Sequence, residues 1–137
     1  MTQTTVETVF PKVRAIVADV LAIDEEDVQL NSRLIGDLGA ESIDFLDFIF
    51  QLEKEFKIKI PRGQLEKKAR GSLAENEFEE GGVITAKGIE ALQAFLSEVP
   101  AASFPQKMKT SEIPLLFTVE TFCKLVVSAV NEKAAEA

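Results

Sequence analysis

Ser42 is the residue whose position in the sequence most clearly suggests chemistry. It follows Gly39, which permits a tight turn, and precedes a run with helical spacing, so the sequence predicts a hydroxyl at the start of a helix. Serine is a good N-cap, and Asp44 is placed to interact with the positive end of the helix dipole. The chain has no histidine, and no base lies near Ser42 in the sequence, so this serine is not a nucleophile by its own means. Any chemistry at Ser42 beyond helix capping therefore needs a separate enzyme.

The helix that would position Ser42 is predicted to run to about Phe56 and to carry two apolar stripes. The first stripe keeps steps of three and four residues, as a buried face does, and consists of Phe45, Phe48, Ile49, Leu52 and Phe56. The second stripe lies beside the first, close to Ser42, and consists of Ile43, Leu46 and Phe50. Because the first stripe already supplies a core face, we expect the second to contact partner molecules, with core packing as the alternative.

The residues around Ser42 carry a family resemblance. Residues 37–44, Asp-Leu-Gly-Ala-Glu-Ser-Ile-Asp, are similar to the Asp-Leu-Gly-x-Asp-Ser-Leu-Asp signature of acyl carrier proteins. The similarity continues through the second helix of that family to the exit Glu-Phe-Lys-Ile-Lys-Ile-Pro, which ends at Pro61. It is detailed from Val6 to Pro61 and resumes weakly near Phe117. Two departures, Glu41 for aspartate and Ile43 for leucine, conserve charge or volume.

The resemblance implies a specific modification. In that family the serine of the motif is joined through phosphate to 4′-phosphopantetheine, which comes from coenzyme A, and the thiol of that group carries an acyl chain. The corresponding residue here is Ser42, and the start of a helix suits a phosphate. The resemblance implies as partners a phosphopantetheinyl transferase and the synthases and acyltransferases that act on acyl chains. The chain itself would be a non-catalytic carrier.

The family also uses the helix after the serine for recognition and the bundle interior for cargo. The resemblance places the partner surface on Glu41, Ile43, Asp44, Leu46, Asp47 and Phe50. It places the acyl pocket along Phe45, Ile49, Leu52 and Phe56, where large rings either fill the space or line it. Residues 44–47, Asp-Phe-Leu-Asp, resemble variants used for specialised acyl chains in envelope lipid synthesis. We therefore expect a role in fatty-acid or lipid biosynthesis.

The remaining pattern predicts an all-α fold, a four-helix bundle with one or two extra helices. We expect a single acyl-carrier-like domain over residues 1–137, with a carrier-like core at 5–61 and 117–131 and an insertion at 62–116. Within the insertion we expect a helix from about 85 to 99, an acidic mobile loop at 75–82 and an extended connector at 101–116. The insertion is interpreted as an added helical layer, a docking surface or a lid over the acyl chain.

Composition excludes several functions. The net charge of −8 and the pI near 4.6 disfavour nucleic acid and favour basic protein partners. Without histidine there is no ordinary proton shuttle and no imidazole ligand, so we expect neither a self-contained hydrolase nor a metal site. Cys123, the only cysteine, is predicted to pack in the core. We see no membrane span and no signal peptide, and we expect a cytoplasmic monomer.

Three alternatives remain open at this stage. The first alternative is a carrier for polyketide or amino-acyl units, a class of carrier that shares the same serine. The second is a binding or scaffold module with the carrier fold and no prosthetic group, acting through its acidic helix and insertion. The third alternative, an enzyme built on the insertion, lacks any credible cluster of acid, base or metal-binding residues.

Overall fold

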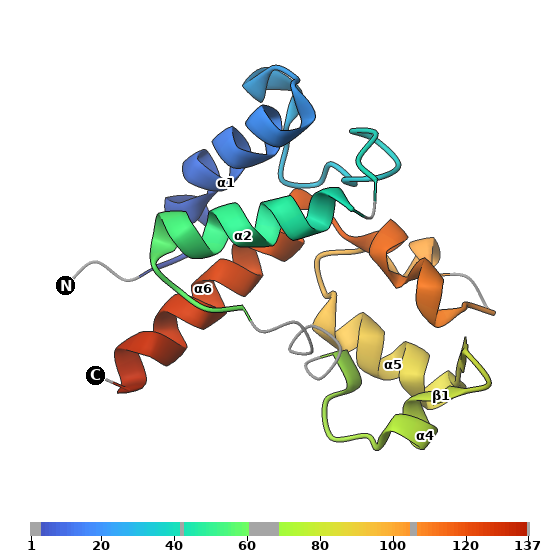
Figure 1. The fold of residues 1–137 in the computed structure, drawn as a ribbon. Helices are drawn as coiled ribbons and strands as arrows, with labels where there is room; N and C mark the ends of the chain where they lie inside the picture. The colour runs from blue at the N-terminus through green and yellow to red at the C-terminus, as the bar shows by residue number, and fades with distance from the viewer. Residues whose placement is uncertain (1–3, 42, 61–68, 105–106, 137) are drawn as a thin grey trace. The chain divides into compact units, whose positions relative to one another are not determined.

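The computed structural model describes residues 4–41, 43–60, 69–104 and 107–136 (Figure 1). The chain divides into two compact units. The first unit consists of Met1–Ile60 and Thr118–Ala137, and the second unit of Pro61–Phe117. The prediction that all 137 residues form one domain stays a prediction. Most of the chain is helical, which confirms the predicted fold class.

Three long helices build the first unit, and α1, Val6–Leu21, packs against both of the others. Thr5 caps α1 in a reciprocal pair of bonds with Thr8, and Ala22 ends it with a left-handed φ of 55°. Apolar spacing predicts this helix over roughly residues 5–21, with a regular start only near Phe10 because of Pro11, but the helix begins at Val6 and continues through the proline. The capping box explains the early start, because it satisfies amides of the first turn before the proline is reached.

The other two helices of the first unit are α2, Asp44–Phe56, and α6, Val119–Glu136. Apolar spacing over residues 45–56 and 119–130 predicts these two helices, but the tail from Glu132, which we expected to fray, is helical as far as Glu136. The side chain of Lys133 donates a hydrogen bond to the carbonyl of Lys57, which joins the last turns of α6 to the end of α2. The fully buried side chains between the three helices include Val13, Val17, Phe48, Leu52, Phe122 and Val126.

The long loop before α2 is anchored at several points. It contains the short 3₁₀ helix η1, Glu25–Asp27, and buries Val28 and Leu34 completely. The start of α6 is tied to it, because the Val119 amide donates to the Ser32 carbonyl at 3.0 Å. The Glu120 amide donates to the Leu30 carbonyl at 2.9 Å. These contacts fix the loop that leads to Ser42.

The second unit combines short helices with a small hairpin, and its principal helix is α5, Ala86–Phe95. Residues 75–82, predicted as a mobile loop, instead form α4, Glu75–Phe78, and one side of the hairpin. Gly81 and Gly82, both with positive φ, form the two-residue turn between β1, Glu79–Glu80, and β2, Val83–Ile84. Positive φ at both turn residues is what a tight hairpin of this kind requires, so the two adjacent glycines are the signal that could have predicted the turn.

Two further predictions for the second unit are wrong. The segment 101–116, predicted as an extended connector, contains the 3₁₀ helices η2, Ala101–Ser103, and η3, Thr110–Leu116. Helix α5 ends at Phe95, short of the predicted Val99, although Leu96 and Val99 are still buried. Short 3₁₀ segments lack the long apolar period by which a helix is recognised in a sequence.

Candidate functional site

The residues on either side of position 42 form a closed turn, while Ser42 itself lies outside the described residues. The Glu41 amide donates to Oδ2 of Asp44 at 2.8 Å, and the Asp44 amide donates to the Glu41 carbonyl at 2.9 Å. Ile43 is the N-cap residue of α2, and Asp44 is its first residue. The carboxylate of Asp44, which was predicted to contact partners, therefore also holds the turn that starts the helix.

The approach to this turn is built from backbone bonds and one buried anchor. The Ala40 amide donates to the carbonyl of Leu34 at 2.8 Å, and the Leu34 side chain is fully buried. Gly39 has a φ of +76°, and a Cβ placed there would meet nothing within 4 Å. The space beside the turn is open, so the glycine serves the backbone conformation rather than a close contact.

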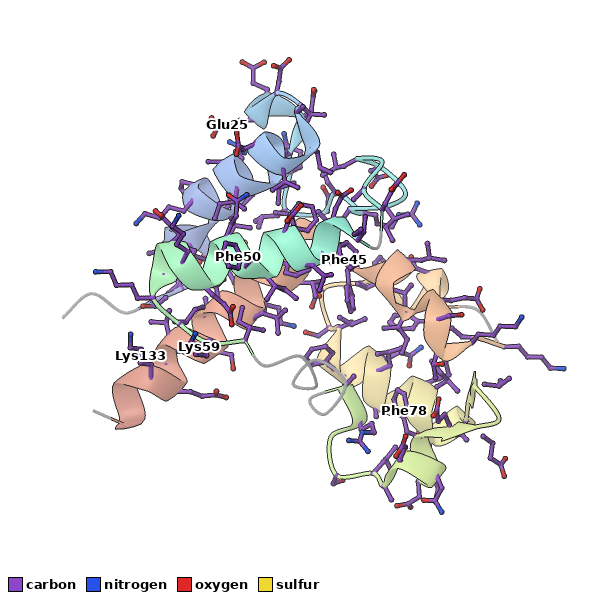
Figure 2. The ribbon with its side chains drawn as sticks, viewed as in Figure 1. Glu25, Phe45, Phe50, Lys59, Phe78 and Lys133 are labelled. Atoms are coloured by element: carbon purple, nitrogen blue, oxygen red, sulfur yellow. The ribbon has the colours of Figure 1, made fainter. Side chains whose placement is uncertain are left out.

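The second apolar stripe of α2 is exposed, as expected. The exposed fractions are 67% for Ile43, 53% for Leu46 and 65% for Phe50. Phe45 and Phe50 both project from α2 (Figure 2). Three large apolar side chains exposed at helical spacing make one continuous patch. Glu41 and Asp47 are exposed as well, so acidic groups border the patch.

The first stripe faces the interior of the first unit. Phe45 is 9% exposed, Leu52 is 1% exposed, and Ile49 and Phe56 are half-buried. Phe45 and Phe48 meet Phe122 of α6, which the helical spacing of residues 119–130 predicts on an apolar face but does not connect with this site. Spacing along one helix does not show which ring on another helix a side chain will meet, so this contact could not be predicted from spacing.

At the far end of α2, charged side chains cover the half-buried ring of Phe56. The ammonium group of Lys12 lies 5.7 Å from the centroid of that ring and 3.5 Å from Oε1 of Glu55. Lys12 belongs to α1, so these contacts link the end of α2 to α1 at the surface of the unit. They place the last residue of the predicted acyl pocket at the edge of the core rather than at its centre.

Cys123 packs in the core of the first unit, as predicted, and is fully buried. Burial raises the pKa of its thiol to about 12, with a smaller contribution from the negative charge of Glu120. The thiol therefore stays protonated and unreactive at neutral pH. Within the described ranges, no three acidic or cysteine side chains gather as a metal site would require. No helix in those ranges is long and apolar enough to cross a membrane.

Comparison with known proteins identifies the family. Residues 11–75 match the family model described as a phosphopantetheine attachment site. The acyl carrier protein of Clostridium acetobutylicum is 46% identical over 59 residues, which cover 43% of this chain and 77% of that protein. This chain belongs to the acyl carrier protein family. The predicted recognition and the predicted prosthetic group, a covalently attached 4′-phosphopantetheine, are confirmed with it.

Other acyl carrier proteins support the same conclusion. That of Thermotoga maritima is 41% identical over 61 residues, 44% of this chain and 75% of that protein. Acyl carrier protein AcpXL of Rhizobium meliloti is 49% identical over 55 residues, 40% of this chain and 58% of that protein. Members of this family carry acyl groups and are generally not catalysts. Each of these three alignments covers less than half of this chain.

Proposed function

We propose that Ser42 is the attachment site of 4′-phosphopantetheine and that this acyl carrier protein is itself not catalytic. The observation that carries the proposal is the place of Ser42 in the motif, within the segment 11–75 that matches the attachment-site model. Both sequence neighbours of Ser42, Glu41 and Ile43, are exposed, so a bulky group attached between them meets no buried wall. When bound, the group supplies a thiol that holds acyl chains as thioesters for separate enzymes.

The protein's own part in the function is to present that group and to be recognised. The Glu41–Asp44 turn holds the attachment segment at the start of α2. The exposed patch of Ile43, Leu46 and Phe50 fits an apolar depression on a partner enzyme, and the neighbouring Asp47 fits a basic rim. Acidic side chains beside an apolar centre speed the encounter and orient it. The partners of this kind are a phosphopantetheinyl transferase, acyl-chain synthases and acyltransferases.

The cargo we propose is a fatty acyl chain for lipid biosynthesis, of the specialised kind used in envelope lipids. Support comes from the Asp-Phe-Leu-Asp pattern at residues 44–47 and from similarity to proteins named AcpXL at 48% and 49% identity. The apolar region that we propose for a folded-back chain lies along Phe45, Ile49, Leu52 and Phe56, from the core to its edge. A cytoplasmic location is part of this proposal.

Intact mass spectrometry tests the attachment directly. The protein is incubated with coenzyme A and a broad-specificity phosphopantetheinyl transferase, beside the Ser42→Ala variant. We expect the wild-type protein to gain the mass of one phosphopantetheine and the variant to gain nothing. A folded wild-type sample that gains no mass with several transferases would contradict the proposal. That result would favour a carrier-fold binding module without a prosthetic group.

A further inference from the structure

An open pocket lies in the first unit, beside η1 and the loop that leads to Ser42. Its volume is about 440 Å³, within the range of small-molecule sites, and η1 can be found in Figure 2 by its first residue, Glu25. The residues that line this pocket, which we call the loop pocket, are Ile23, Asp27, Asn31, Ser32, Asp37 and Leu38. Four of these six side chains are polar, so the loop pocket does not suit an acyl chain.

The polar groups of the loop pocket include both hydrogen-bond donors and acceptors. Oγ of Ser32 accepts from the Gln29 amide at 3.0 Å, so the hydroxyl still has its own proton to donate. Ser32 is only 8% exposed, which fixes this group in place. Oδ2 of Asp37 accepts from the Arg33 amide at 2.8 Å, and this bond holds the carboxylate at the pocket. The exposed side chain of Asn31 adds an amide, which both donates and accepts.

This lining selects a neutral ligand that carries amide groups. The described residues that line the loop pocket include no lysine or arginine, so the pocket does not attract a phosphate. Its two carboxylates are not joined by a third acidic or cysteine side chain from the described ranges, as a metal site would require. The pantetheine arm of the prosthetic group is neutral and contains amides, a hydroxyl and geminal methyl groups. Ile23 and Leu38, both half-buried, offer apolar surface for those methyl groups.

The loop pocket is within reach of a group attached to Ser42. Leu38 lies four residues before Ser42, and four residues of backbone span at most about 14 Å. The arm between phosphate and thiol is a chain of amide units of comparable length. A group tethered by a short flexible link has an effective concentration in the millimolar range. Even a weak pocket at this distance is therefore occupied for much of the time.

We propose that the loop pocket binds the pantetheine arm when the arm carries no acyl chain. The inference rests on the proposed function, because the arm is attached through Ser42. The carboxylates of Asp27 and Asp37 accept hydrogen bonds from the amide N–H groups of the arm. The side chains of Ser32 and Asn31 donate to its carbonyl groups. The first unit thus gives the free arm a resting position beside η1, from which a partner enzyme withdraws it.

Amide hydrogen exchange, measured before and after loading with phosphopantetheine, tests the proposal. The three proteins are wild type, the pocket variant Asp27→Ala with Asn31→Ala, and the control variant Asp24→Ala with Asn131→Ala. The control removes the same side-chain types from exposed positions outside the pocket lining, and the Asp24 side chain makes no capping bond to η1. The peptide compared covers residues 27–32. These residues lie ten or more positions before Ser42, so slower exchange there is not a local effect of the attachment.

In wild type and in the control variant we expect loading to slow exchange of residues 27–32 by about threefold or more, because the bound arm stabilises the pocket. In the pocket variant we expect loading to leave the exchange unchanged. The proposal is overturned if loading does not slow exchange in wild type, or if it slows exchange as much in the pocket variant. Asn31→Ala alone replaces the double variant if the latter does not fold. Absence of any mass gain on loading is a separate outcome, and it contradicts the proposed function itself.

Discussion

Gly88 is the position where a single added methyl group should disrupt the second unit. It lies in the first turn of α5, and its amide donates to the hydroxyl of the N-cap residue Thr85 at 3.0 Å. The Thr85 amide in turn donates to the carbonyl of Phe78 at 2.9 Å. A Cβ on Gly88 would lie 2.2 Å from that carbonyl oxygen and 2.7 Å from Cγ2 of Ile84. The methyl group would therefore press on the backbone that joins α5 to α4.

The size of the effect follows from opposing contributions. Forcing a methyl group into a closely packed site costs about 1–3 kcal/mol. Weakening the Thr85–Phe78 hydrogen bond adds about 1 kcal/mol. Alanine is favoured over glycine in a helix by about 1 kcal/mol, which offsets part of this cost. We expect Gly88→Ala to lower the free energy of unfolding of the second unit by about 1–3 kcal/mol.

Amide hydrogen exchange measured by mass spectrometry is the suitable assay, because the chain has neither tryptophan nor tyrosine to report unfolding by fluorescence. Amides of α5 and the hairpin should exchange about ten- to hundredfold faster in Gly88→Ala than in wild type, as a loss of that size implies. Gly36→Ala is the matched control, since the three atoms nearest to its added Cβ are side-chain atoms of Arg33 at 3.6 Å or more, an ordinary contact distance. Equal protection of α5 in both variants and wild type would refute the packing argument.

Three further predictions concern the first unit. Replacing Asp44 and Asp47 by lysine should slow the transfer of phosphopantetheine at low salt and have less effect at high salt, because salt screens the electrostatic attraction between carrier and transferase. Transferase kinetics at two ionic strengths check this prediction. Unchanged rates at low salt would contradict the acidic docking surface. The Cys123 thiol should resist iodoacetamide at pH 8 in the folded protein and react in denaturant, because burial raises its pKa to about 12. Because the pKa of an ordinary thiol is about 8.5, only the unfolded form loses this proton as pH rises above about 9. The free energy of unfolding should therefore fall over that range, and denaturant titrations at pH 7 and pH 10 check this.

The sequence predicts the first unit well because its helices carry long apolar periods. The steps from Phe45 to Phe56 place one stripe inside, and the same periodicity leaves Ile43, Leu46 and Phe50 outside, as the structure shows. The start of α1 was harder to predict, because Pro11 argued against an early start. Reciprocal capping by Thr5 and Thr8 decided it. Such capping bonds involve only two side chains and leave no trace in the apolar spacing, so the spacing alone could not place the start of the helix before Pro11.

The second unit and the contact between Phe45 and Phe122 were less predictable for a different reason. Hairpin strands of two residues show no alternation, and only the positive φ values of Gly81 and Gly82 account for the turn. The meeting of Phe45 with Phe122 joins residues far apart in the chain, so it depends on how α6 packs against α2. Spacing assigns each ring to a buried face, but only the three-dimensional packing assigns its partner.

The anchoring of the start of α6 has a consequence for how the chain can be rearranged. The Val119 and Glu120 amides are bonded to the loop before α2, and the Ile60 amide is bonded at 2.6 Å to Oε2 of Glu53 in α2. The chain therefore leaves the first unit and returns to it at two points that the first unit itself holds. Because doubling the length of a closed loop costs only about 0.6 kcal/mol, the segment between these points is thermodynamically free to vary in length. We therefore expect the first unit to accept a different segment between Ile60 and Val119, or new chain termini placed within that segment.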